Sequence, residues 1–190
     1  TPDLSRYNNA QYLNQIQLFL LCRENRDYAC RFVLKNIYGN FVLNEKGTPW
    51  SLPALAKSAK NLAFNQVNGQ TPTGVHQINS VMPMANKFEL FGKYRRLILD
   101  WIPASRSQML TKQFLPRSRH QENWWKRASI ARDIGRLHLR VHGTGRLNKD
   151  PLSTWYPHMP TAGCISTREG RYVAKSYMGQ RQVQDKIVLA

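Results

Sequence analysis

The chain has 190 residues, of which 42% are hydrophobic and 11% aromatic, so it can bury one sizeable core, and a disordered polypeptide is excluded. Its 28 lysines and arginines outnumber 11 acidic residues, giving a formal net charge of +17. Such a charge favours polyanionic partners, namely nucleic acid, anionic membrane surfaces or cell-wall polymers.

The first half of the chain predicts a helix followed by β-structure. Apolar residues recur at helical spacing between Tyr12 and Glu24, so we expect an amphipathic helix within an N-terminal helical extension over residues 1–27. Residues 30–37 and 41–43 flank the turn-forming Tyr38-Gly39-Asn40 and predict a hairpin. A short helix over residues 55–64 and a strand over residues 75–78 are expected next.

The second half predicts a helical insertion between strands. Residues 93–101 follow helical spacing, and the basic segment 105–134 is expected to be helical with a break at Pro116, which gives an insertion around 93–134 over the functional groove. Residues 137–142 and 186–189 read as strands. The prediction is a mainly β fold with added helices, in one domain over residues 28–190.

No transmembrane segment is expected. The apolar run over residues 16–22 is the only notable one near the start, and Arg23 and Glu24 follow it directly. A run of that length is too short to cross a bilayer as a helix.

The three cysteines lie at positions 22, 30 and 164. Cys22 and Cys30 can close a small loop if their Cα atoms come close enough, and the alternative is two reduced core cysteines. With that bridge formed, Cys164 would be the odd thiol, which is worth considering as a reactive group in an exported protein.

The neighbours of Cys164 indicate a nucleophile. Ser166 and Glu169 have the spacing of a capping box, which predicts a helix that begins after Ile165 and continues to about Tyr177. The free N–H groups and the dipole at its start would favour the thiolate and could hold an oxyanion. Gly163 would allow a tight turn that leaves the thiol accessible.

A base for this thiol is available in the preceding strand. Residues 137–142 alternate strictly, with Leu137, Leu139 and Val141 on one face and His138, Arg140 and His142 on the other. His142 ends the polar row immediately before Gly143-Thr144-Gly145 breaks the strand, so its imidazole can project into a cleft as a general base. The alternative is that these histidines lie on a solvated strand face.

Two ordered signatures resemble those of the L,D-transpeptidase catalytic domain family. One is His142-Gly143-Thr144 followed by Thr161-Ala162-Gly163-Cys164-Ile165, and the other is the upstream stretch Thr71-Pro72-Thr73-Gly74-Val75-His76-Gln77-Ile78. The resemblance covers about residues 30–190. It implies a β-sandwich core, no cofactor and no metal, and a location in the periplasm or elsewhere in the cell envelope after export.

The resemblance also implies residue roles. Cys164 would attack a carbonyl of a peptidoglycan stem peptide and form a thioester, while His142 takes the thiol proton. The carbonyl of Gly143 would orient the imidazole, and the amides of Gly163 and Cys164 would face the oxyanion. The residues expected to contact substrate are His138, Arg140, His158 and Arg168.

The chain departs from the family pattern in three places, one of which is a longer segment between the two signatures with a helical-looking insertion. Many members carry a histidine where this chain has Ala162, which leaves His142 as the sole expected base. Many also carry an arginine where this chain has Ser166, so Arg140 or Arg168 is expected to take its place. The acceptor stays open, because an amine makes a transpeptidase whereas water makes an L,D-carboxypeptidase or endopeptidase with the same catalytic residues.

Other classes of function remain as alternatives. A non-catalytic basic module that binds cell wall or polyanions needs no reactive thiol. Residues 117–127 mix cations with aromatics and could contact nucleic acid, but they also fit a helix with Trp124, Ala128 and Ala131 buried, and no nucleic-acid partner is predicted. A zinc site is disfavoured because His138 and His142 would lie about 13 Å apart along a strand.

Overall fold

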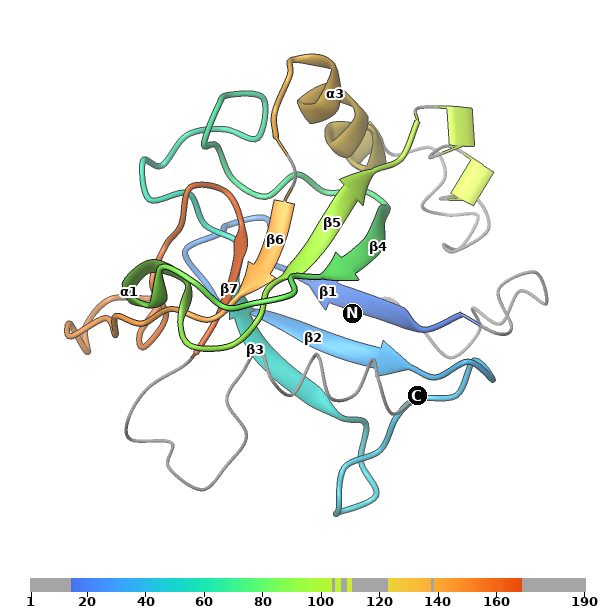
Figure 1. Ribbon diagram of the computed structural model, residues 1–190, viewed down its shortest axis with the longest axis horizontal. Helices are drawn as coiled ribbons and strands as arrows, with labels where there is room; N and C mark the ends of the chain where they lie inside the picture. The colour runs from blue at the N-terminus through green and yellow to red at the C-terminus, as the bar shows by residue number, and fades with distance from the viewer. Residues whose placement is uncertain (1–14, 104, 107–108, 111–122, 138, 169–190) are drawn as a thin grey trace.

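The computed structural model describes residues 15–103, 105–106, 109–110, 123–137 and 139–168. These form a mainly β fold around one curled sheet (Figure 1). The strands are β1 (Gln17–Leu21), β2 (Cys30–Lys35), β3 (Ser51–Leu55), β4 (His76–Val81), β5 (Leu97–Trp101), β6 (Leu139–His142) and β7 (Ile165–Thr167). Within the described chain their order across the sheet is β1-β2-β3-β7-β6-β5-β4.

β6 and β7 pair in parallel, whereas the other neighbouring strands of the described sheet run antiparallel. In that pair Val141 lies opposite Ile165 and His142 lies opposite Ser166. Parallel strands need a crossover connection, and residues 143–164 supply it. The register continues so that Cys164, which directly precedes β7, lies beside Arg140, two residues before His142, near the middle of the sheet.

The core lies on one face of the curled sheet. Its buried side chains are Phe32, Leu34, Trp50, Leu52, Ala54, Leu97, Leu99, Leu139, Val141 and Ile165. Because side chains alternate along a strand, the residues between them in β6, Arg140 and His142, lie on the opposite face. The predicted alternation is confirmed over residues 139–142. It is wrong at Leu137, which precedes the strand and is 85% exposed rather than facing the core.

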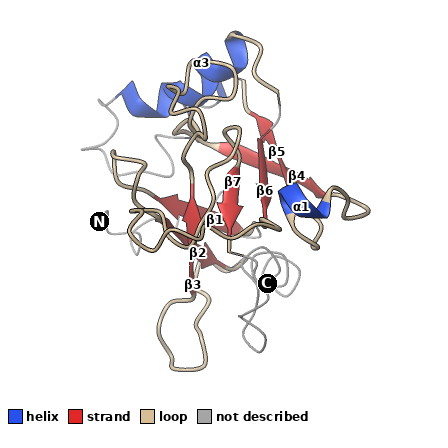
Figure 2. Ribbon diagram, turned by 90° about the vertical axis from the view of Figure 1, so that its left-hand side faces the viewer, coloured by secondary structure: helices blue, strands red, loops and turns tan. Residues whose placement is uncertain are grey.

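The described helices are short and lie outside the sheet, with α1 (Phe88–Phe91) well apart from α3 (Arg127–Asp133) (Figure 1 and Figure 2). A 3-10 turn, Asn123–Lys126, leads into α3. The backbone N–H of Ala128 donates to the carbonyl of Thr73 at 2.9 Å. No described helix is long and apolar enough to cross a membrane.

The predicted N-terminal helix is wrong over residues 17–21, which form β1; residues 1–14 lie outside the described part. β1 pairs with β2 along its whole length, from Gln17 opposite Lys35 to Leu21 opposite Arg31. Ile16, Leu18 and Leu20 pack against the core. The buried side chains therefore repeat every two residues, as in a strand, and not every three to four, as in a helix. The apolar residues in this stretch fit both periods, and sheet pairing decides between them.

Two further predicted helices are also wrong. Residues 97–101 form β5, in which Leu97 and Leu99 are buried in alternation. Leu55 ends β3, and the residues that follow form a loop in which Ser58 pairs with Thr161 in a β-bridge. In both places tertiary pairing overrides local spacing.

The remaining predicted elements are largely confirmed. A turn joins β2 to Phe41, which pairs with Lys35 as the predicted hairpin requires. The strand predicted over residues 75–78 is part of β4. The basic segment is helical where it is described after residue 122, although Trp125 rather than Trp124 is its buried tryptophan. The strand predicted over residues 186–189 lies outside the described residues.

Candidate active site

Cys164 ends a turn that is hydrogen-bonded on both sides. The backbone N–H of Thr161 donates to the carbonyl oxygen of Lys57 at 3.1 Å, and the backbone N–H of Ala59 donates to the carbonyl oxygen of Thr161 at 2.7 Å. The Thr161 hydroxyl donates to the carbonyl of Cys164 at 2.7 Å. These bonds fix the backbone that carries the thiol.

Gly163 could not be another residue without rearrangement. Its φ of 98° lies in the left-handed region, which residues other than glycine rarely adopt. A Cβ atom here would lie 2.3 Å from the carbonyl oxygen of Gly69 and 2.4 Å from the guanidinium of Arg136. The turn is therefore packed against the loop before Thr71 as closely as backbone can approach.

The helix predicted to begin after Ile165 is wrong over the described residues, because Ile165–Thr167 form β7. Ser166 is fully buried, and its hydroxyl donates to the carbonyl of Met159 at 2.8 Å rather than capping a helix. Glu169 lies outside the described residues. Over residues 165–168, the part of this segment that the structure describes, no helix supplies a dipole to Cys164.

His142 is oriented by its own neighbour. Its Nδ1 lies 2.5 Å from the carbonyl oxygen of Gly143. A carbonyl oxygen can only accept, so Nδ1 carries the proton and Nε2 presents a lone pair. Nε2 is buried and has no hydrogen-bond partner among the described residues. The imidazole thus has a free acceptor nitrogen within the protein.

The imidazole is neutral at neutral pH. The pKa of His142 is lowered to about 4, mainly by burial and to a smaller extent by the charges of Arg96 and Arg140, while the hydrogen bond to Gly143 opposes the shift. The Phe91 ring meets the imidazole edge to face, with the ring centroids 4.9 Å apart. A neutral, sterically confined imidazole is in the protonation state that a general base needs.

Opposing influences act on the thiol of Cys164. Burial raises its pKa, whereas a hydrogen bond accepted from the backbone of Arg140 and the positive charges of Arg140, Arg136 and Arg96 lower it. Burial is the larger influence, so the resting pair is a neutral thiol and a neutral imidazole. The arginines would stabilise negative charge when it develops on sulfur.

His142 and Cys164 line one cavity of about 490 Å³. Since Val141 and Ile165 are paired and face the core, the residues on either side of them, His142 and Cys164, share the opposite face of the sheet. Within the described residues the Cys164 thiol donates no hydrogen bond to Nε2 of His142. Catalytic hydrogen bonds are often formed only once substrate is bound.

Arginines give the cavity a cationic wall. Arg136 donates to the backbone carbonyls of Phe64, Gly69 and Gln70 at 2.5, 2.9 and 2.9 Å, and these neutral acceptors leave its charge intact. The Nε of Arg140 is buried with no hydrogen-bond partner among the described residues. Glu89, the one carboxylate among the described lining residues, pairs with Arg146 at 3.1 Å.

A buried arginine also stands behind the imidazole. The guanidinium of Arg96 lies 4.1 Å from the centroid of the Phe91 ring, and its Nε donates to the sulfur of Met82 at 2.8 Å. The Phe91 ring in turn contacts His142. Sequence reasoning missed Arg96 and Phe91 because the segment around residue 96 was read as a helix, and it missed Arg136 because that residue precedes the strand motif.

The predicted substrate contacts are only partly brought together. Arg140 lines the cavity. His158 is buried away from the cavity lining, and the exposed Arg168 is also not among the lining residues. His138 lies outside the described residues. Within the described chain no three metal-ligating side chains cluster.

The predicted insertion does not cover the cavity within the described residues. Helix α3 contributes no lining side chain, whereas the residues just after it, Gly135, Arg136 and Leu137, do. Ala128 and Ala131, which the sequence predicts to be buried, are 3% and 0% exposed. The helix therefore directly precedes a lining segment in the chain without lining the cavity itself.

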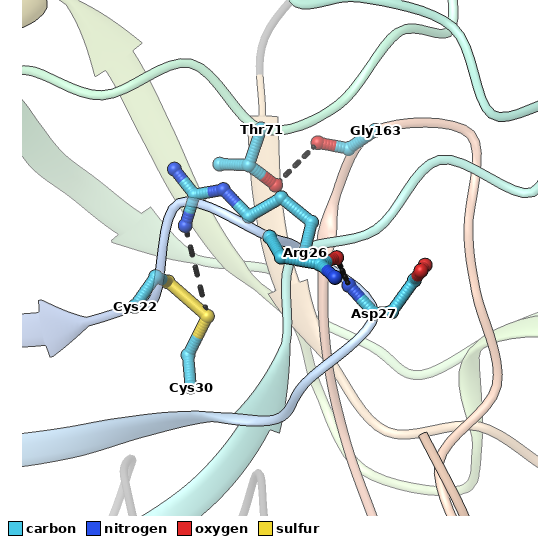
Figure 3. The surroundings of a disulfide bond; sticks show 7 residues. Cys22, Arg26, Asp27, Cys30, Thr71 and Gly163 are labelled. Carbon is cyan, nitrogen blue, oxygen red and sulfur yellow. Dashed lines mark hydrogen bonds between the residues drawn. A yellow bond between two sulfur atoms is a disulfide. The ribbon is translucent and has the colours of Figure 1, made fainter. Parts of the chain in front are cut away.

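The structure settles the pairing of the other two cysteines. Cys22 and Cys30 form a disulfide, with their Cα atoms 4.3 Å apart. Figure 3 shows Arg26, which is 8% exposed, directing its guanidinium to Cys30 Sγ at 3.8 Å. Cys164 is left as the free thiol.

Comparison of the chain with protein-family models, curated proteins and solved structures finds no match.

Proposed function

We propose that the protein is a cysteine acyltransferase of the L,D-transpeptidase type that acts on peptidoglycan stem peptides. The observation that carries the proposal is the shared cavity of Cys164 and His142, reached from adjacent parallel strands. The orientation of His142 by the Gly143 carbonyl leaves Nε2 as the acceptor. A thiol, an oriented base and a cationic wall are what acyl transfer through a covalent intermediate uses.

The proposed reaction has two steps. Nε2 of His142 takes the proton of Cys164 as the sulfur attacks a stem-peptide carbonyl carbon, and the amine of the broken peptide bond leaves with that proton. An acceptor amine, or water, then gives its proton to Nε2 and attacks the thioester carbonyl, which releases Cys164. An amine acceptor makes a cross-link, whereas water makes the reaction an L,D-carboxypeptidase or endopeptidase.

Charge in the cavity supports an anionic substrate. Arg140 and Arg136 line it, and peptidoglycan stem peptides carry carboxylates. The developing oxyanion is assigned to the amides of Gly163 and Cys164 within the rigid turn. These assignments are part of the proposal, together with a sandwich-like core and a single catalytic domain over residues 28–190.

The proposed location is the cell envelope. A disulfide persists in oxidising compartments such as the bacterial periplasm and is uncommon in the cytosol. The Cys22–Cys30 bridge supports export on that ground. The net charge of +17 also suits an anionic polymer as substrate.

The test is intact-mass spectrometry after incubation with a disaccharide tetrapeptide. We expect a covalent adduct on the wild type, no adduct on Cys164→Ser, and at least about a hundredfold slower adduct formation for His142→Gln. His158→Gln is the matched control, because His158 is also buried, 4% exposed against 1% for His142, but does not line the cavity. A wild-type protein that never forms the adduct, under conditions in which the thiol is reduced, would overturn the proposal.

The products separate the candidate reactions. A cross-linked dimer identifies an amine acceptor, and loss of the terminal residue without cross-linking identifies water. Binding to peptidoglycan sacculi without any adduct would instead identify a non-catalytic wall-binding module, in which Cys164→Ser binds as the wild type does.

A further inference from the structure

The connection between β4 and β5 exposes a group of large apolar side chains. Met84 is 74% exposed, Phe88 58% and Leu90 56%. Helix α1, which carries two of them, contains no buried residue. We call Met84, Lys87, Phe88 and Leu90 the α1 patch. Exposed large apolar side chains that lie within seven residues of one another are candidates for an interaction surface, whereas single scattered ones are ordinary.

The backbone that carries Phe88 and Leu90 is fixed by hydrogen bonds and by a close contact with another segment. The N–H of Gly92 donates to the carbonyl of Phe88 at 2.9 Å, and Leu90 and Phe91 donate to Lys87 at 3.0 and 3.1 Å. A Cβ on Gly145 would lie 2.1 Å from the carbonyl oxygen of Phe88, so the two backbones are in close contact. The patch therefore belongs to the folded structure.

Positive charge accompanies the apolar group. Lys87 lies inside the patch at the start of α1, and the exposed Lys93 follows the helix. The chain as a whole carries a net charge of +17. Apolar side chains beside lysines match a bilayer with anionic headgroups, in which the apolar groups enter the interface while the cations meet phosphates.

The size of the patch favours a bilayer over a protein partner. A specific protein interface buries about 800 Å² on each side, and two apolar side chains on a four-residue helix with Met84 just before it cover far less. Interfacial insertion needs only a few apolar side chains when electrostatic attraction assists them.

We propose that the α1 patch docks the protein on anionic lipid bilayers with the mouth of the cavity toward the membrane. The patch adjoins that mouth, because Glu89, Leu90 and Phe91 line the cavity. Val67 and Leu137, which also line it, are 66% and 85% exposed. Docking would use the surface alone, so it does not depend on the chemistry proposed for Cys164.

The test is co-sedimentation with vesicles of equal parts phosphatidylglycerol and phosphatidylcholine, using protein with Cys164→Ser to exclude thiol reactions. We expect Met84→Ser with Phe88→Ser to lower the partition coefficient at least about tenfold. Lys87→Glu should lower it several-fold, and vesicles of phosphatidylcholine alone should bind weakly. Circular dichroism checks that each variant is folded.

Leu43→Ser is the matched control, because Leu43 is 53% exposed and lies beyond β2, outside the patch. Binding by this variant should equal that of the unsubstituted surface. Vesicle binding that survives Met84→Ser with Phe88→Ser, or that Leu43→Ser reduces equally, overturns the proposal. Concentration-dependent dimerisation that this double variant abolishes, in a protein that does not bind vesicles, assigns the patch to a second copy and also overturns it.

Discussion

The hydroxyl of Thr71 donates a hydrogen bond of 2.9 Å to the carbonyl oxygen of Gly163, across 92 positions of the chain. Thr71 is 6% exposed, and its partner directly precedes Cys164. The bond joins the Thr-Pro-Thr-Gly stretch to the Gly-Cys turn, which are the two signatures that the sequence presents far apart. One buried hydroxyl thus connects the loop before β4 to the candidate nucleophile.

Thr71→Val is expected to lower the free energy of unfolding by about 1–3 kcal/mol, because it leaves the buried Gly163 carbonyl without its donor. It should also change the rate at which iodoacetamide alkylates Cys164. Thr71→Ser keeps the hydroxyl and is the control, with most of the stability and the wild-type rate retained. Urea unfolding and the alkylation rate check both; equal values for Thr71→Val and the wild type would contradict the role of this bond.

The β-hairpin and the strands at residues 76 and 139 could be predicted from the sequence, because their local alternation agrees with their tertiary environment. The segments at residues 17–21 and 97–101 could not. Their apolar residues fit a helical period, and pairing with β2 and β6, which is absent from local sequence, makes them strands. The helix predicted to start at Ser166 was wrong for a related reason. The Ser-x-x-Glu spacing of a capping box can also occur in a strand, and the sequence alone does not distinguish the two.

The cavity was partly predictable. His142, Gly143, Arg140 and Cys164 are marked by strand alternation and a glycine-rich turn. Arg136 lines the same cavity from outside any motif, held there by its hydrogen bonds to backbone carbonyls. Arg96 does not line the cavity but packs on the ring of Phe91, which does.

Gly163→Ala is expected to destabilise the protein by more than about 3 kcal/mol, because it adds steric overlap to left-handed backbone strain. Gly47→Ala is the matched control, since Gly47 has a φ of 73° but nothing within 4 Å of an added Cβ. It should cost only about 1 kcal/mol, the strain alone. Urea midpoints measure both, and equal losses would mean that the close approach to Gly69 and Arg136 does not matter.

Arg140→Gln is expected to raise the pKa of Cys164 further above its ordinary value, because one of the charges that opposes burial is removed. The rate of alkylation at pH 8 should fall several-fold, since each unit of pKa is a factor of about ten in thiolate. Arg31→Gln is the control, because Arg31 contacts Ser51 at 2.8 Å and does not act on the thiol. A faster reaction of Arg140→Gln would show that its guanidinium blocks access rather than stabilising charge.

Removing the disulfide with Cys22→Ser and Cys30→Ser is expected to cost roughly 2–3 kcal/mol, the chain-entropy value for a short closed loop. Reductant should lower the free energy of unfolding of the Cys164→Ser protein by the same amount, seen as a lower urea midpoint. It should not change the midpoint of the double variant. A midpoint insensitive to reductant in the parent would mean that the bridge contributes nothing measurable to stability.

Acid should destabilise the protein through its buried imidazoles. Burial lowers the pKa values of His76, His142 and His158 to about 4, below the ordinary 6.5, so the unfolded chain binds protons that the folded chain refuses. Their contribution is complete above pH 6.5 and is lost as the pH falls toward 4, at up to about 1.4 kcal/mol per pH unit for each histidine. His158→Gln removes one of the three without touching the cavity lining, so urea unfolding at several pH values should show a shallower loss between pH 6.5 and 4. An unchanged slope would mean that this imidazole is protonated equally in both states.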